Sequence, residues 1–104
     1  MKTAISIGDR ILDISVNLAR IGNWTADSYE QKRELIHRFI SQTNKYVKEV
    51  ASLSLSEQVK PLFSRFQSEF QKLQDEKVTS ENKDWWAERA LTWANILQHR
   101  ARLA

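Results

Sequence analysis

The stretch DWWAERALTWANILQHRARLA, residues 84–104, carries three of the protein's four tryptophans and contains neither glycine nor proline. At about 100° per residue, most of its apolar side chains gather on the side of a helix opposite Glu88. This periodicity predicts an amphipathic helix that buries one face against other helices. The residues expected in the core are Trp86, Ala90, Trp93, Ala94, Leu97 and Ala101.

A second apolar column runs along the same helix, about 60–80° from Glu88. It consists of Trp85, Ile96 and Leu103, with Arg89 and Arg100 on its borders. One interpretation is a helix that buries a wide face by packing against two neighbours. The other is a protein-binding surface, because interface hot spots are rich in Trp and Arg. We take the binding surface as the working hypothesis.

The amino-terminal segment predicts another helix, from about Ala4 to Ile21, with Gly22 as a left-handed C-cap. Its apolar stripe is Ile7, Ile11, Ile14, Leu18 and Ile21, and its polar side carries Asp9, Asp13, Asn17 and Arg20. A second column here consists of Ile5, Leu12, Val16 and Ala19. The apolar arc is therefore about twice the ~100° that a peripheral helix needs. Leu12 and Val16 join the candidate partner-binding residues.

Two more helices are expected between these ends. The first of the two begins after Thr25 or Asp27 and runs to near Ser52. The C-terminal helix described above begins after Thr79 or Ser80. The second of the two lies between the first and the C-terminal helix. It begins either at the capping box that starts at Ser54 or at Pro61. Its apolar stripe is Val59, Phe63, Phe66, Phe70 and Leu73.

Four amphipathic segments joined by short polar turns predict an all-α fold, an up-down antiparallel four-helix bundle. The alternative is a three-helix bundle with the first helix loosely docked or exchanged between protomers. The 104 residues fit one domain, residues 1–104. Because the chain has no cysteine, disulfides and thiolate metal sites are excluded.

Charge and hydropathy indicate the cellular setting. Sixteen basic and thirteen acidic residues give a net charge of +3, and they are interspersed along the chain. The first apolar run is broken at residues 8–10, before it reaches the length of a signal-peptide core. No stretch approaches the ~18 apolar residues of a membrane span. We therefore expect a soluble, cytoplasmic protein with no membrane partner.

The residue types that carry chemistry are few. Glu34 and His37 have the Glu-x-x-His spacing of di-iron carboxylate bundles, but the position three before His99 is Ile96. No metal site and no cofactor are expected, because that motif must occur twice. The chain has no Gly-x-Ser-x-Gly elbow and no glycine-rich phosphate loop. We expect neither an enzyme nor a site for a small-molecule substrate.

These observations favour a non-catalytic protein-interaction module, a small helical subunit, adaptor or regulator that binds a protein partner or a second copy of itself. The alternative is a nucleic-acid-binding accessory subunit that uses basic residues of the second helix and of the C-terminal helix. For that alternative the candidate residues of the second helix are Arg33, Arg38 and Lys45. Glutamates interrupt the basic residues, so a mixed solvated face is favoured over a phosphate-binding surface.

Overall fold

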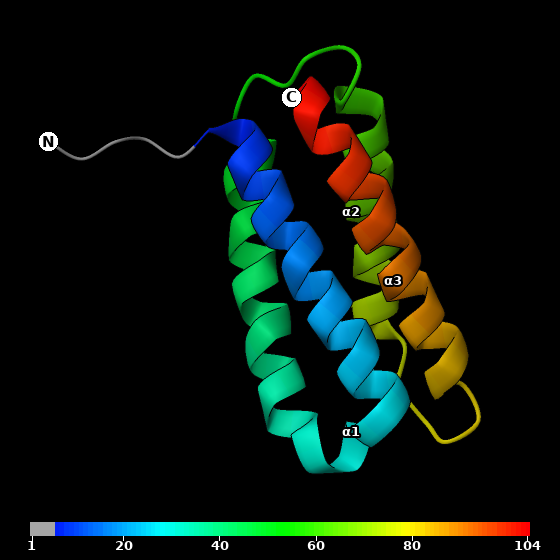
Figure 1. Cartoon of the computed structure of the whole chain (residues 1–104). Coiled ribbons are helices and arrows are strands. Elements are labelled where there is room, and N and C mark those ends of the chain that lie inside the picture. Colours follow the sequence, from blue (N-terminus) through cyan, green and yellow to red (C-terminus); the bar gives the residue numbers. More distant parts are fainter. Residues whose placement is uncertain (1–5) are drawn as a thin grey trace, which may run out of the picture.

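The computed structural model describes residues 6–104, and within that range the chain is helical apart from its connections. Three α-helices are formed there, α1 (Ile7–Ala51), α2 (Lys60–Asp75) and α3 (Lys83–Arg100), followed by the 3-10 turn η1 (Ala101–Leu103). The all-α prediction is confirmed. The helices pack side by side with their axes roughly aligned, and the start of α1 lies at the same end as the C-terminus (Figure 1).

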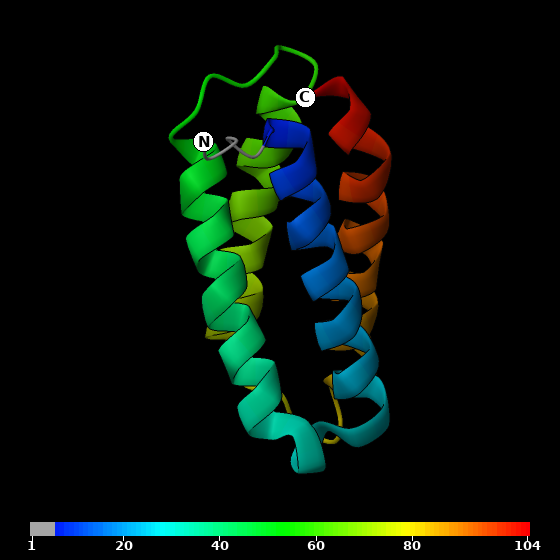
Figure 2. The same cartoon turned by 60° about the vertical axis from the view of Figure 1, so that its left-hand side comes forward.

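The helix α1 contains 45 residues and folds back on itself at Ser28, where φ is −155° and ψ is 50°. We call residues 7–27 the N-arm and residues 29–51 the C-arm; they run antiparallel, and α2 and α3 continue the up-down order (Figures 1 and 2). The four helical segments that were expected are thus present in part: the first two are joined across the bend at Ser28 as one continuous helix, which leaves three α-helices. The expected start at Ala4 lies outside the described residues.

The expected helix end at Ile21 is wrong. Gly22 is buried within the N-arm, and no residue in the range 6–104 has a positive φ. Thr25, expected as an N-cap, is also buried inside the helix. Lys83 of α3 donates to the Ala26 carbonyl at 3.3 Å, which satisfies one acceptor freed by the bend. The turn therefore begins later than its polar sequence indicates.

Gly22 serves the packing of two helices. A Cβ atom there would lie 3.1 Å from the Ala87 carbonyl oxygen and 2.8 Å from Leu91 Cγ. A Cβ atom at Gly8 would lie 2.8 Å from the Ala101 carbonyl oxygen. The absence of a side chain at both glycines therefore allows the N-arm to approach the backbone of α3 closely.

These contacts belong to one seam of small residues, which we call the small-residue seam. Its members on the N-arm are Gly8, Ser15 and Gly22. They face Ala101 of η1, Ala94 of α3 and Ala87 of α3 respectively. At its centre Ser15 Oγ donates to the Ala94 carbonyl at 2.6 Å. Both sets repeat every seven residues, as expected for antiparallel helices that stay in contact. The alternative of a loosely docked first helix is therefore wrong.

The largest side chains of the core are aromatic residues of α2 and α3, and they pack with buried aliphatic residues of α1. Phe66 stacks on Phe70 with ring centroids 5.4 Å apart and tilts against Trp93 at the same centroid distance. Every residue expected in the core of the last helix is buried, as are the five apolar residues of the stripe through Phe66. The predicted core faces of these two helices are confirmed.

The starts of α2 and α3 are set by local chemistry. The helix α2 begins at Lys60 with Pro61 in its first turn, so the start at Pro61 was the better prediction and the start at Ser54 is wrong. The helix α3 begins at Lys83. Just before it, the Thr79 N–H donates to Asn82 Oδ1 at 2.7 Å, and the Asn82 N–H donates to Thr79 Oγ1 at 3.2 Å. This reciprocal pair fixes the turn into α3.

Polar side chains join the two arms of α1. Asn17 is buried, although it was expected on the solvated side, and its Nδ2 donates to Gln42 Oε1 at 3.0 Å. Arg10 Nε lies 2.6 Å from Glu49 Oε2, and the Arg10 guanidinium lies 4.3 Å from the centre of the Tyr46 ring. The bond from Asn17 satisfies a buried polar group between the arms, and both sets of contacts help to fix the register of the hairpin.

Candidate functional site

Large apolar side chains remain exposed on this protein. Within residues 6–104 they are Leu12 (39% exposed), Val16 (48%), Leu53 (44%), Trp85 (51%) and Leu103 (40%). Four of these five belong to the second apolar columns of the first and last predicted helices. Ile96 is half-buried against the core, and Ile5 lies outside the described residues. The columns therefore face solvent for most of their length.

Trp85 lines a recess between α2 and α3 with a volume of about 530 Å³, which we call the Trp85 recess. Its charged lining residues are Glu69, Lys72, Asp75, Glu76 and Arg89. Arg89 Nη2 lies 3.5 Å from Glu69 Oε2, so these two charges offset each other. Among the described residues, Asp75 and Glu76 form no ion pair. The recess thus combines a half-exposed indole with an excess of carboxylate.

The rest of that column lies far from Trp85. Leu103 belongs to η1, where its carbonyl accepts a hydrogen bond of 2.9 Å from Ser56 Oγ. At about 1.5 Å per residue, Leu103 is roughly 27 Å along the helix axis from Trp85. Arg100 is exposed at the same distant end. The structure therefore brings Arg89 to Trp85, but it separates Arg100 and Leu103 from them.

Leu12 and Val16 belong to the N-arm, and they lie beside a different face of α3 from the one that carries Trp85. They line a shallow groove of about 280 Å³ between the N-arm and α3, with Leu91, Asn95 and Gln98 on the opposite wall. Leu91 lies about 120° around α3 from Trp85. Of the predicted partner-binding residues, Trp85 and Arg89 thus share one surface, and Leu12 and Val16 share another. The remaining three, Ile96, Arg100 and Leu103, line neither of them.

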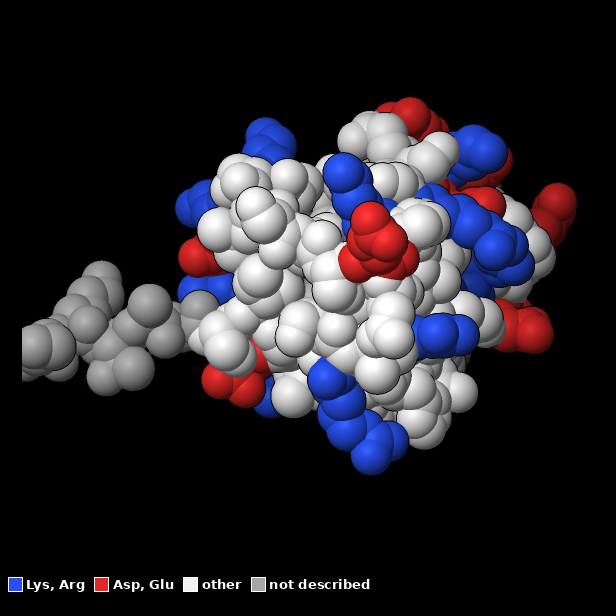
Figure 3. Space-filling view, turned by 90° about the horizontal axis from the view of Figure 1, so that it is seen from above, with Lys and Arg blue, Asp and Glu red and all other residues white. Residues whose placement is uncertain are grey.

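The basic residues proposed for nucleic acid do not share one face. Arg38 and Lys45 are exposed and lie within about 20° of each other on the C-arm, whereas Arg33 lies about 140° from Arg38. Seen from the end where the C-terminus lies, basic and acidic side chains are interspersed around the perimeter (Figure 3). The structure shows no single basic stripe through these three residues, and binding to nucleic acid stays an untested alternative.

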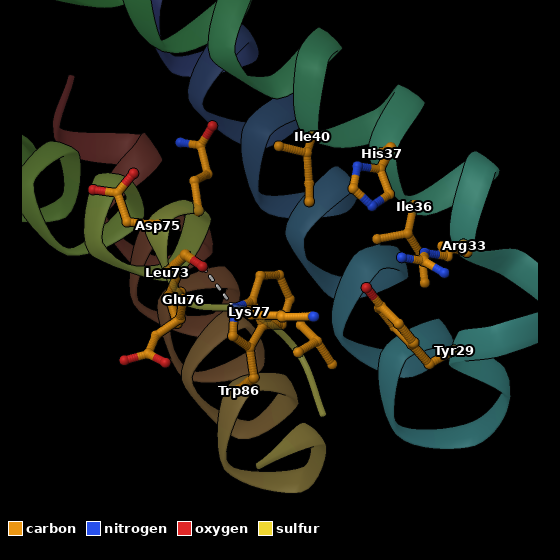
Figure 4. A pocket seen from close by; sticks show the side chains of 12 residues that line it. Tyr29, Arg33, Ile36, His37, Ile40, Leu73, Asp75, Glu76, Lys77 and Trp86 are labelled. Atoms are coloured by element: carbon orange, nitrogen blue, oxygen red, sulfur yellow. Dashed lines mark hydrogen bonds between the residues drawn. The ribbon is translucent and has the colours of Figure 1, made fainter. Parts of the chain in front are cut away.

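Arg33 instead lines a pocket of about 280 Å³ between the C-arm and the end of α2 (Figure 4). Arg33 and His37 come from the C-arm, and Asp75 and Glu76 lie across from them. This pocket could not be predicted from the sequence, because its acidic residues belong to a polar stretch with the pattern of a solvated linker. Since both signs of charge line it, the pocket has no strong field for a ligand of one sign.

The floor of that pocket is fixed by Trp86. Its Nε1–H donates to the Leu73 carbonyl at 2.8 Å, the dashed line in Figure 4. This bond adds a second donor to one of the last carbonyls of α2, which also accepts from the Glu76 N–H at 3.3 Å. Trp86 is therefore a structural residue, whereas its neighbour Trp85 points out of the core.

Within residues 6–104, no cluster of three or more His, Cys, Asp or Glu residues is placed to hold a metal ion. None of the described helices combines the length and the apolar character needed to cross a membrane.

No protein-family model, curated protein or solved structure matches the chain.

Proposed function

We propose that this protein is a non-catalytic interaction module, a small helical subunit, adaptor or regulator that binds a partner protein through the Trp85 recess. The observation that carries the proposal is the half-exposed indole of Trp85 beside an ion-paired arginine. A partner that covers this indole removes apolar surface from water, which contributes about 25 cal/mol per Å². Trp and Arg are also the residues most often found as interface hot spots.

The charges of the recess favour a partner that presents a Lys or Arg side chain. A cation that lies over a tryptophan ring within about 6 Å is attracted by the ring face. Asp75 and Glu76, which line the same recess, supply carboxylates for that cation. Arg89 competes little for them, because it is already paired with Glu69.

Trp85→Ala tests this proposal against the interpretation of Trp85 as core. We expect its melting temperature to stay near that of the wild type, because the indole is half in water. Partner binding is expected to weaken by about 2 kcal/mol or more if Trp85 is a hot spot. The comparison variant is Trp93→Ala, which removes a buried indole from the same helix and is expected to destabilise the fold. Thermal melts and affinity purification measure the two effects.

A charge test leaves the indole in place. The double variant Asp75→Lys/Glu76→Lys reverses the free carboxylates of the recess, and we expect it to lose the proteins that the wild type retains. The matched control is Glu81→Lys, an exposed acid outside the recess. Capture that is equal in all three proteins, or that disappears on nuclease treatment, would contradict the proposal. Equal destabilisation by Trp85→Ala and Trp93→Ala would do so as well.

A further inference from the structure

The second exposed surface is self-complementary, and we propose that it pairs with the same surface of a second copy of this chain. We call it the Leu12–Val16 face. It consists of Leu12 and Val16 on the N-arm and of Leu91, Asn95 and Gln98 on α3. Leu12 and Gln98 also line an adjoining hollow of about 410 Å³ toward the chain ends, so the groove is continuous along the small-residue seam.

Charged side chains lie at both ends of this uncharged centre. On the N-arm, Asp9 and Arg20 are exposed and lie within about 20° and 40° of Val16 around the helix. Arg20 leans toward the C-arm, with its guanidinium carbon 5.8 Å from the centre of the Phe39 ring. Asp13 is engaged by Arg10 at 2.9 Å and contributes little free charge. The N-arm thus carries a negative charge at one end of the face and a positive charge at the other.

The helix α3, together with the turn η1 that follows it, carries the opposite order of charges. Glu88 and Arg102 are exposed, and they lie about 60° and 20° from Leu91 by helical periodicity. Because the helices are antiparallel, Arg102 lines the hollow that Asp9 also lines. At the other end Gly22 packs against Ala87, so the neighbouring Arg20 and Glu88 lie at the same level of the two helices. Asp84, one turn before Glu88, adds a second carboxylate at that corner. The charges at the four corners of the face therefore alternate in sign, in the order Asp9, Arg102, Glu88 and Arg20 around it.

Alternating corners select a second copy as the occupant. A symmetric dimer uses the same patch on both subunits, so each residue i meets a residue j of its mate. With the two-fold axis along the bundle, Asp9 meets Arg102 of the second copy and Arg20 meets its Glu88. With the axis across the bundle, Asp9 meets Arg20 of the second copy and Glu88 meets its Arg102. Both arrangements place opposite charges together, whereas a partner of uniform charge would meet like charges at half of the corners.

The size of the face predicts a reversible dimer. From Asp9 to Arg20 the face spans only about 17 Å of helix. A stable interface needs about 800 Å² on each partner, so a face this short is expected to hold a dimer weakly. Leu12 of one copy and Val16 of the other lose contact with water in the arrangement across the bundle. Because the flanking charges are exposed, we expect the association to weaken as salt is added.

Sedimentation equilibrium on the full chain tests the proposal from micromolar to millimolar concentrations. We expect the average mass to rise with concentration from 12.2 kDa toward twice that value. Val16→Lys is expected to weaken the dimer roughly tenfold or more, because it places two cations at the centre of the interface. Leu53→Lys is the matched control, since Leu53 is a similarly exposed apolar residue outside this face.

Charge exchange identifies the arrangement of the dimer. Arg20→Glu is expected to weaken association in either geometry, and Arg38→Glu on the C-arm is its control. Adding Asp9→Arg to Arg20→Glu restores association if the axis crosses the bundle, and adding Glu88→Arg restores it if the axis runs along the bundle. A chain that stays monomeric throughout the range, equal effects of Val16→Lys and Leu53→Lys, or no restoration by either addition would overturn the proposal. Trp85→Ala should leave the dimer unchanged, which separates this test from that of the Trp85 recess.

Discussion

Phe66→Ala is expected to lower the free energy of unfolding by about 3–5 kcal/mol. Phe66 is fully buried and contacts Phe63, Phe70 and Trp93 through its ring. Truncation leaves a cavity that these large rings fill only in part, so lost contacts add to lost burial. Domains of this kind are stable by about 5–15 kcal/mol in total. The variant should therefore melt far below the wild type or be unfolded.

Phe39→Ala is the matched control for this prediction. Phe39 is only half-buried, at the edge of the bundle, where it meets Trp24 edge to face. The same substitution there removes the same atoms but less burial, so a smaller loss is expected. Urea unfolding followed by circular dichroism measures both. Equal losses in the two variants would show that the aromatic cluster around Phe66 is not the centre of the core.

Replacing both Gly8 and Gly22 with Leu is expected to cost roughly 2–6 kcal/mol, about 1–3 kcal/mol at each overpacked site. The first carbon of each new side chain would meet a backbone carbonyl oxygen. At position 8 that carbon would lie 2.8 Å from the Ala101 oxygen of η1, and at position 22 it would lie 3.1 Å from the Ala87 oxygen of α3. A backbone carbonyl cannot turn away as the end of a side chain can, so the N-arm must move. This cost exceeds the ~1 kcal/mol per residue that leucine gains over glycine in helix propensity.

The control places leucine one residue further along, at Asp9 and Asn23, which are both exposed. Those two substitutions should change the stability little, apart from the loss of a favourable carboxylate in the first turn of α1. Thermal melts of the two double variants provide the comparison. If the glycine variant is as stable as its control, the small-residue seam does not hold the N-arm against α3.

The buried faces of the helices could be predicted from the sequence because burial leaves a local periodic signal. The spacing from Phe63 to Phe70 and from Trp86 to Ala101 identifies residues that are all buried. The same rule separated the second columns that contain Trp85, Leu12 and Val16, but it left open whether they are buried or exposed. It could not show that Trp85 and Val16 lie on separate surfaces, because a helical wheel does not say which neighbour covers each side.

The polar site residues were harder to find. Asp75 and Glu76 stand in an acidic, lysine-containing stretch that carries no periodicity. They line the Trp85 recess only because α2 ends beside the start of α3. Asn17 was expected in solvent, and its burial depends on Gln42, which lies on the other arm. Pairing across such a distance in sequence cannot be inferred from either residue alone.

The sequence by itself determined that the chain is helical and which faces of the helices are buried, because propensity and apolar spacing act between residues close in the chain. Tertiary structure decided where the first helix reverses and how closely helices approach. Gly22 has the local context of a helix end, yet it lies inside a helix, where its lack of a side chain allows the close approach to Ala87. The heptad spacing of Gly8, Ser15 and Gly22 was visible in the sequence. Its meaning depended on Ala87, Ala94 and Ala101, since close packing is a property of two helices together.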